Sequence, residues 1–300
     1  MLSRQFVRGL AGPAMASALA LTAYPASGAP SPPAIVVVAA ENFYGDVVGQ
    51  IAGDHVRVTS IISDPNVDPH EYETNARDAA AVANARLVIQ NGLGYDAFID
   101  HLVAASPNPR RKVIVVAQLT GHVKGDNVHL WYDPATIPEV AQAILDALVQ
   151  IDPGSATSYR NWYKAFQASL VPLHQAIAGI KAQYAGTPVA FTEPVFGYMA
   201  AALGLKVLTP LAFQKAIEEG EDPPASALAQ MEDQLRQHQV KALLYNTQTV
   251  SPITTRVQQL AKSVGVPVVG VSETEPPGKS YQQWMLAQLE QLRLALGQGR

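Results

Sequence analysis

Short apolar runs rich in β-branched residues recur along the chain, and each is followed by a polar turn and by apolar positions with helical spacing. They predict strands at residues 35–38, 56–62, 87–90, 113–117, 188–191, 206–209, 240–245 and 267–271. Strands that alternate with helices are typical of parallel sheets covered by helices on both faces. The pattern therefore predicts an α/β protein.

The predicted strands form two sets, separated by residues 152–184, which carry no strand signal. This segment opens with Asp-Pro, a typical helix start, and its large apolar side chains recur every three or four residues. If continuous, the helix would be roughly 45 Å long. Pro172 should kink it, and residues 186–188 should end it. We therefore expect an N-terminal α/β lobe, a long linking helix and a C-terminal α/β lobe, at residues 29–151, 152–186 and 187–300.

Residues 1–28 have the layout of a cleavable secretory signal. Arg4 and Arg8 come first without an acid, and residues 9–23 are mostly Leu, Ala, Met and Gly. The apolar stretch contains Pro13 and is shorter than the roughly 20 residues that span a bilayer, which favours cleavage over a retained anchor. The chain has no cysteine, which excludes a lipid-modified cysteine, disulfides and thiolate metal sites. We expect a periplasmic protein without a lipid anchor.

Charge and composition narrow the function classes. The formal net charge is −4, and loss of a signal with two arginines and no acid would make it more negative. Such a balance argues against nucleic acid as a partner. A hydrophobic fraction of 48% fits a globular protein with a full core.

Three short segments place a potential metal ligand where a predicted strand gives way to a loop. They are residues 68–72 (Asp-Pro-His-Glu-Tyr), 127–134 (Asn-Val-His-Leu-Trp-Tyr-Asp-Pro) and 192–198 (Thr-Glu-Pro-Val-Phe-Gly-Tyr). Neutral imidazole together with carboxylate suits a divalent first-row metal ion. Proteins with parallel sheets usually bind their ligands beyond the carboxyl ends of the strands. The three segments therefore predict a metal site in a cleft.

The two lobes also repeat one short pattern. Glu41 and Glu193 each begin a Glu-x-x-aromatic-Gly sequence after the first predicted strand of a lobe. Both glutamates would then border the crevice between the lobes. For Glu41 the better-supported alternative is an acid that simply favours a helix N-terminus.

Several segments, in order along nearly the whole mature chain, resemble the zinc and manganese substrate-binding proteins of bacterial metal ABC transporters. They are residues 53–58, 68–72, 85–92, 129–134 and 196–198. The resemblance implies two α/β lobes joined by one long helix, with the metal site in the cleft between them. It also implies a protein that binds Zn²⁺ or Mn²⁺ outside the inner membrane, delivers the ion to a permease and catalyses nothing.

The resemblance also implies a ligand set, one residue at a time. His70 and His129 match the first two ligands, and Glu193 matches the third, which is His in many zinc members and Glu in many manganese members. The fourth is usually Asp, but this chain offers only Glu273 and Glu275 in that loop. We choose Glu273 because it lies closer to the end of the preceding strand. The alternative is that both are solvated loop acids.

The cargo stays open between Zn²⁺ and Mn²⁺, with one ion per chain. Zn²⁺ favours four tetrahedral ligands rich in nitrogen or sulfur, whereas Mn²⁺ accepts more oxygen, so two imidazoles and two carboxylates move the site away from a pure zinc design. Zn²⁺ nevertheless binds more tightly than Mn²⁺ at almost any such site. The remaining histidines fall in no ligand motif: His55, His101, His122, His174 and His238.

The same residues can be compared with the requirements of three other functional classes. A metal-dependent hydrolase would also use imidazole and carboxylate ligands, but the chain has no His-Glu-x-x-His and no Gly-x-Ser-x-Gly. Residues 92–97 have the outline of a dinucleotide fingerprint, yet the next predicted strand ends without the acid that binds ribose. A metal-binding adhesin is a third class. We expect a monomeric carrier whose partners are a divalent metal ion and an inner-membrane ABC permease.

Overall fold

The computed structural model describes residues 1–2 and 35–298. Apart from its first two residues, the expected signal segment at residues 1–28 lies outside the described part. Among the helices of the described residues, none combines the length and the apolar character that crossing a membrane requires.

A four-stranded parallel sheet forms the first lobe, in the order β2-β1-β3-β4. Its side chains on β1 and β3 are almost all buried, as expected for a sheet covered on both faces. The strands are β1 Ile35–Glu41, β2 Val56–Ile62, β3 Leu87–Gln90 and β4 Lys112–Val115. The helices are α1 Asn42–Ala52, α2 Ala76–Asn84, α3 Phe98–Ala105, α4 Val116–Leu119 and α5 Thr136–Ile151.

The second lobe repeats this topology, because its parallel strands follow the order β6-β5-β7-β8. In each lobe the first strand lies between the second and the third. The strands are β5 Pro188–Phe191, β6 Lys206–Val207, β7 Leu243–Asn246 and β8 Val268–Val271. The helices are α8 Gly197–Ala202, α9 Leu211–Glu218, α10 Ala225–Arg236, α11 Pro252–Ser263 and α12 Tyr281–Gly297.

Five of the eight predicted strands have other bounds in the structure. The run at 35–38 continues as a strand to Glu41, and the run at 267–271 forms a strand only from Val268. The run at 113–117 turns helical at Val116, and the run at 240–245 pairs only from Leu243, because an apolar run signals burial and not pairing. The run at 206–209 stops pairing at Val207. There the Thr209 hydroxyl accepts the Phe191 N–H at 2.9 Å, so a side chain takes the place of a ladder carbonyl.

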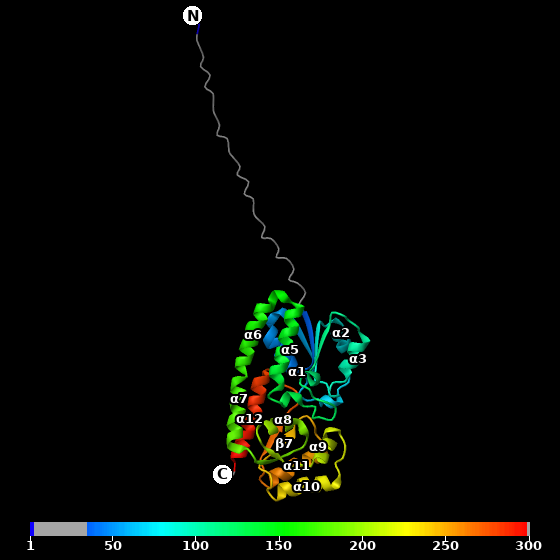
Figure 1. Ribbon diagram of the computed structural model, residues 1–300, viewed down its shortest axis with the longest axis vertical. Coiled ribbons are helices and arrows are strands. Elements are labelled where there is room, and N and C mark those ends of the chain that lie inside the picture. Colours follow the sequence, from blue (N-terminus) through cyan, green and yellow to red (C-terminus); the bar gives the residue numbers. More distant parts are fainter. Residues whose placement is uncertain (3–34, 299–300) are drawn as a thin grey trace. The chain divides into compact units, whose positions relative to one another are not determined.

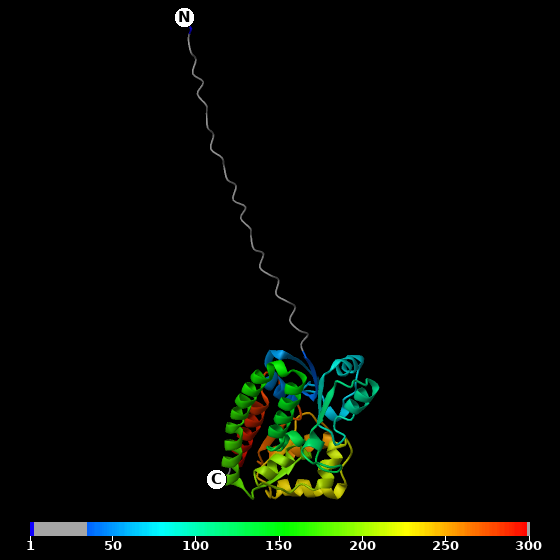
Figure 2. The ribbon, with the colours of Figure 1, turned by 45° about the horizontal axis from the view of Figure 1, so that its top comes forward.

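The segment between the lobes is helical but divided. It consists of α6 Ala156–Ser169 and α7 Val171–Tyr184, with the break at Leu170. Pro172 lies in the first turn of α7, where its missing N–H has no helical partner to lose. Gly186, with φ of +82°, follows the end of α7 as expected. Figures 1 and 2 show α6 and α7 following one another along both lobes, with α12 beside α7.

One large apolar cluster includes buried side chains from both lobes and from α7 and α12. Within it the rings of Phe43 and Trp131 stack with centroids 4.5 Å apart, and the ring centroid of Trp284 of α12 lies 6.0 Å from that of Phe43. Each lobe has a smaller cluster of its own in addition. The lobes are therefore held together by a shared core, and the loops at the carboxyl ends of their strands face one another.

Candidate metal centre

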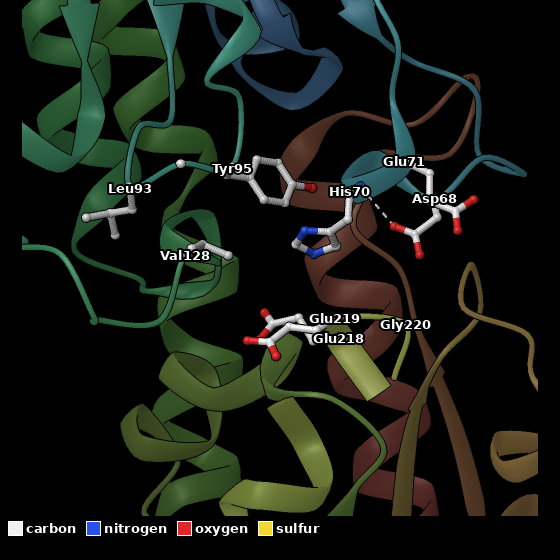
Figure 3. Close-up of a pocket in the computed structure, with 10 residues that line it drawn as sticks. Asp68, His70, Glu71, Leu93, Tyr95, Val128, Glu218, Glu219 and Gly220 are labelled. Atoms are coloured by element: carbon white, nitrogen blue, oxygen red, sulfur yellow. Dashed lines mark hydrogen bonds between the residues drawn. The ribbon is translucent and has the colours of Figure 1, made fainter. Parts of the chain in front are cut away.

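His70 lies in a short 3₁₀ turn, Pro69–Glu71, that fixes the direction of its imidazole. The Asp68 carboxylate caps this turn by accepting the His70 N–H at 2.9 Å (Figure 3). The His70 ring meets the Tyr95 ring edge-on with centroids 5.1 Å apart. The turn does not follow its strand directly, because β2 ends at Ile62. The expectation that His70 sits at a strand end was therefore wrong, although its turn was predicted.

His129 is fully buried at the start of the 3₁₀ turn Leu130–Tyr132. Its backbone N–H and its Nδ1 both contact Asn127 Oδ1, at 3.0 and 2.7 Å. Because Asn127 Oδ1 accepts in both contacts, Nδ1 is a protonated nitrogen, and Nε2 is the ring nitrogen without a hydrogen-bond partner. A buried nitrogen in this state is suited to bind a metal ion.

Asn127 also connects this imidazole to the second lobe. Its Nδ2 donates to the Pro194 carbonyl oxygen at 2.7 Å, and the Tyr198 hydroxyl donates to the Asn127 carbonyl at 2.9 Å. A Cβ atom on Gly197 would lie 2.8 Å from Asn127 Nδ2. The glycine of the Phe-Gly-Tyr motif is therefore explained by this close approach between the lobes.

The two imidazoles converge on Glu273, which is fully buried. His70 Nε2 and His129 Nε2 each lie 3.3 Å from Glu273 Oε2. The Tyr95 hydroxyl donates to the same oxygen at 2.9 Å. Glu275, the alternative in this loop, does not join them; its backbone N–H donates to Asn42 Oδ1 at 3.0 Å.

The carboxylates and imidazoles of this cluster shift one another's pKa values. Burial raises the pKa of Glu273, but its contacts with His129 and His70 and their positive charge outweigh burial and hold the pKa below its usual range. Burial works against protonation of His70, yet the contact with Glu273 and the charges of Glu273 and Asp68 raise its pKa to about 9. Protons thus occupy the position that a cation would take, and a metal ion must displace them.

Glu193 belongs to the same buried network and is one hydrogen bond removed from Glu273. Asn246 Nδ2 donates to Glu193 Oε2 at 3.0 Å and to Glu273 Oε1 at 2.6 Å, and the Thr249 hydroxyl donates to Glu193 Oε2 at 3.2 Å. Burial, and then the charge of Glu273, raise the pKa of Glu193 to about 8. The other carboxyl oxygen of Glu193, Oε1, is buried without a partner.

The four predicted metal ligands are thus not all equally close to one another. His70, His129 and Glu273 meet directly, and Glu193 stands behind Asn246. Two tighter groups, whose ligand atoms lie within 4.8 Å of one another, include residues that the sequence reasoning missed: His70 with His129 and Glu218, and Asp68 with His70 and Glu273. Asp68 lies in the Asp-Pro-His motif, but nothing in that motif separates a cap from a ligand. Glu218 belongs to an acidic run that resembles any solvated loop.

A pocket of about 440 Å³ leads to these residues from solvent. Figure 3 shows His70 from the first lobe and Glu218 from the second on opposite sides of it, with Tyr95 beside the imidazole. Two imidazole nitrogens and several carboxylate oxygens around one point form a donor set for a divalent transition-metal ion.

Comparisons with known proteins agree with this chemistry. The sequence profile of the family described as zinc-uptake complex component A, periplasmic, matches residues 37–295. The chain is 28% identical over 163 residues to a putative metal-binding protein of Chlamydia trachomatis, and 30% identical over 146 residues to the manganese-binding lipoprotein MntA of Halalkalibacterium halodurans. These alignments cover 52% and 47% of this chain, and they span 57% and 48% of the relatives.

The fold has known counterparts as well. The periplasmic zinc-binding protein TroA from Treponema pallidum superposes with a TM-score of 0.73 at 20% sequence identity. The match covers 88% of this chain and 99% of TroA. Since the identity is low, this likeness establishes the two-lobed fold, which confirms the predicted α/β architecture.

Proposed function

We propose, because the chain belongs to the periplasmic zinc-uptake component A family, that it captures a divalent transition-metal ion and delivers it to an ABC permease for import. The observation that carries this proposal is the convergence of His70 Nε2 and His129 Nε2 on one oxygen of Glu273, at 3.3 Å each. Binding outside the cytoplasm fits the family, which is periplasmic. The absence of a lipid anchor and a monomeric state belong to the proposal.

The proposed ligands are His70, His129, Glu193 and Glu273, one ion per chain. The first two come from the first lobe and the last two from the second, so a single ion would be held between lobes. This set rests on the proposed division of the chain into lobes at residues 29–151 and 187–300 with a helical link between them. Movement of Glu193 from Asn246 toward the imidazoles would complete the set.

The cargo is proposed to be Zn²⁺ or Mn²⁺. The named relatives include a manganese-binding protein and a zinc-binding one. Two nitrogen and two oxygen donors allow four-coordinate Zn²⁺, and bidentate carboxylates allow the higher coordination that Mn²⁺ accepts.

The family consists of substrate-binding proteins, and we extend this to the absence of catalysis. A hydrolase needs a metal-bound water at an open position of the ligand shell. Here buried carboxylates from the second lobe face both imidazoles and can fill the shell with protein atoms. The ion is then a cargo to be released intact.

Native mass spectrometry with elemental analysis, on protein taken from its own compartment, tests the proposal directly. We expect one Zn²⁺ or Mn²⁺ per chain, and an increase in melting temperature when either ion is added to metal-stripped protein. His129→Ala should abolish that increase, and Glu275→Ala should retain it. A melting curve that neither ion moves would refute metal capture. Metal-dependent ester, peptide or phosphate hydrolysis that His70→Ala abolishes would replace the carrier with a hydrolase.

A further inference from the structure

Glu218 is the last residue of α9 and extends from the second lobe to the pocket that contains His70. Its Oε1 lies 3.7 Å from His129 Nδ1. One ligand atom from each of Glu218, His70 and His129 lies within 4.8 Å of the other two. Figure 3 shows the Glu218 side chain on the far side of the pocket from His70.

A negatively charged side chain is energetically unfavourable at the C-terminal end of α9. The last turn of a helix carries partial negative charge, so an acid there is destabilising. Burial raises the pKa of Glu218 and outweighs the charges of His129 and His70, which lower it; the charges of Glu273 and Glu219 raise it by smaller amounts. The side chain is only 16% exposed. Residues that break local rules in this way are expected at functional sites.

The imidazole beside Glu218 provides an independent observation. His129 Nδ1 is already held by Asn127 Oδ1 at 2.7 Å, so Glu218 is not needed to orient the ring. His129 Nε2 is buried and has no hydrogen-bond partner. Glu218 therefore lies on the Nδ1 side of an oriented imidazole whose Nε2 is directed at Glu273, and an oxygen of Glu218 lies within 4.8 Å of a ring nitrogen of His70.

We propose that Glu218 is an additional metal ligand, supplied by α9 from the mouth of the pocket, and that it shifts the selectivity of the site toward Mn²⁺. This inference rests on the proposed metal capture. With His70, His129, Glu193 and Glu273 alone the shell holds two nitrogens and two carboxylates. Glu218 adds a third carboxylate and closes the side that faces solvent.

Selectivity follows from coordination number. Zn²⁺ is satisfied by four tetrahedral donors, and a fifth adds little. Mn²⁺ accepts more donors and prefers oxygen among them. Replacement of Glu218 should therefore weaken Mn²⁺ binding much more than Zn²⁺ binding.

The test compares Glu218→Gln with Glu219→Gln in the full mature protein. Glutamine keeps the size of the side chain and removes its charge. Glu219 is the adjacent residue, also lines the pocket and is exposed, so it controls for charge at the mouth. Competition titrations of metal-stripped protein should show that Glu218→Gln weakens Mn²⁺ binding by about 10-fold or more, with a several-fold smaller loss for Zn²⁺. Glu219→Gln should leave both affinities close to those of the unchanged protein.

Co²⁺ gives a second readout that reports geometry, because its visible absorption is strong in four-coordinate sites and weak in six-coordinate ones. We expect the band of the Co²⁺-loaded protein to grow stronger in Glu218→Gln and to stay unchanged in Glu219→Gln. The metal-free melting temperature of Glu218→Gln should be equal to or above that of the unchanged protein, since the change removes a disfavoured acid. This separates loss of a ligand from loss of the fold.

Two results would overturn the inference. Equal affinities in Glu218→Gln and Glu219→Gln, for both ions, would show that Glu218 does not bind the metal. Tighter binding in Glu218→Gln would show that the carboxylate merely pairs with protonated His129 in the empty site and competes with the ion. Failure of metal capture itself would look different, because the unchanged protein would then bind neither Mn²⁺ nor Zn²⁺.

Discussion

The two lobes share one topology but contribute different chemistry to the cleft. The first lobe supplies imidazoles, His70 and His129, and the second supplies carboxylates and the Asn246 amide. Each lobe nevertheless has a glutamate where its first strand ends, Glu41 at the end of β1 and Glu193 just beyond β5. These two residues occupy equivalent places and have different surroundings.

Glu41 is fully buried beside another acid, Asp96. Burial, and then the negative charge of Asp96, raise the pKa of Glu41 well above its usual range, which favours its neutral form. Asp96 in turn accepts the N–H groups of Asn91 and Gly92 at 2.6 and 2.8 Å. Glu41 thus pairs with an acid of its own lobe, and the expectation that it borders the crevice stays a prediction.

Glu193 differs because a neutral amide, Asn246, donates a hydrogen bond to it and to the neighbouring acid, Glu273. Asn246 donates to both Glu193 and Glu273, so the two carboxylates are held close to one another and to the imidazoles. The comparison indicates that the shared topology gives the two glutamates equivalent positions, and that the residues around each glutamate decide its role.

The largest effect should come from neutralising the two equivalent glutamates in turn. Glu193→Gln should weaken Mn²⁺ and Zn²⁺ binding by more than about 100-fold, beyond what a supporting residue contributes. Glu41→Gln should change affinity by less than about 3-fold, because burial and Asp96 favour the neutral form of Glu41 and it belongs to neither group of candidate ligands. Isothermal titration of metal-stripped variants measures both. Equal losses would show that the two strand ends are functionally alike.

Removing the two supporting amides, one from each lobe, should have the next largest effect. Asn127→Ala frees the His129 ring, and Asn246→Ala frees Glu193 and Glu273. Each should weaken metal binding by about 10- to 100-fold, as is usual for residues that orient ligands. Asn84→Ala, which removes a hydrogen bond to the Ala80 carbonyl on exposed α2, is a control that should leave affinity unchanged. If only one amide matters, then one lobe alone positions the ion.

Changes in pH should separate the empty site from the loaded one. The pKa values of His70 and Glu193 are raised from 6.5 to about 9 and from 4.5 to about 8. Both groups therefore stabilise the metal-free fold fully below their unfolded pKa values, and this stabilisation is lost as pH rises through about 8 and 9. A metal ion displaces these protons when it binds. For each proton released, its affinity should therefore rise about tenfold when the pH rises by one unit, up to about pH 9.

Melting curves with and without Zn²⁺ from pH 6 to pH 9 test this expectation. The metal-free melting temperature should fall across the range, and the increase caused by the ion should grow. Imidazoles with ordinary pKa values would level off near pH 6.5 instead. A plateau there would show that the acid cluster of the second lobe does not influence His70.

The smallest effect should come from the second glutamate of the loop after β8. Glu275→Gln should change metal affinity by less than about 3-fold, since Glu275 contacts Asn42 through its backbone and lies apart from the imidazoles. Glu273→Gln serves as the positive control in the same titration. The reverse order would mean that the loop shifts by two residues when it binds the ion.

The sequence was sufficient to predict most of the fold, because buried parallel strands leave a clear apolar pattern. It predicted the strands at 56–62, 87–90 and 188–191 with their observed bounds. It could not show that Val116 starts a helix or that Thr209 replaces a backbone partner, since both depend on tertiary contacts. The family resemblance, and not spacing alone, was needed to group His70, His129 and Glu273, which the structure brings together. Asn246 and Glu218 were missed because a lone amide and an acidic run carry no local signal.

The apolar cluster that spans both lobes has a consequence for how the molecule comes apart. Neither half could be cut out and refolded alone, because the separated faces would leave side chains such as Phe196 and Trp284 in water. Calorimetry of the metal-free protein should accordingly show one cooperative transition, with equal calorimetric and van't Hoff enthalpies. Two resolved peaks would mean that the halves behave as independent folding units.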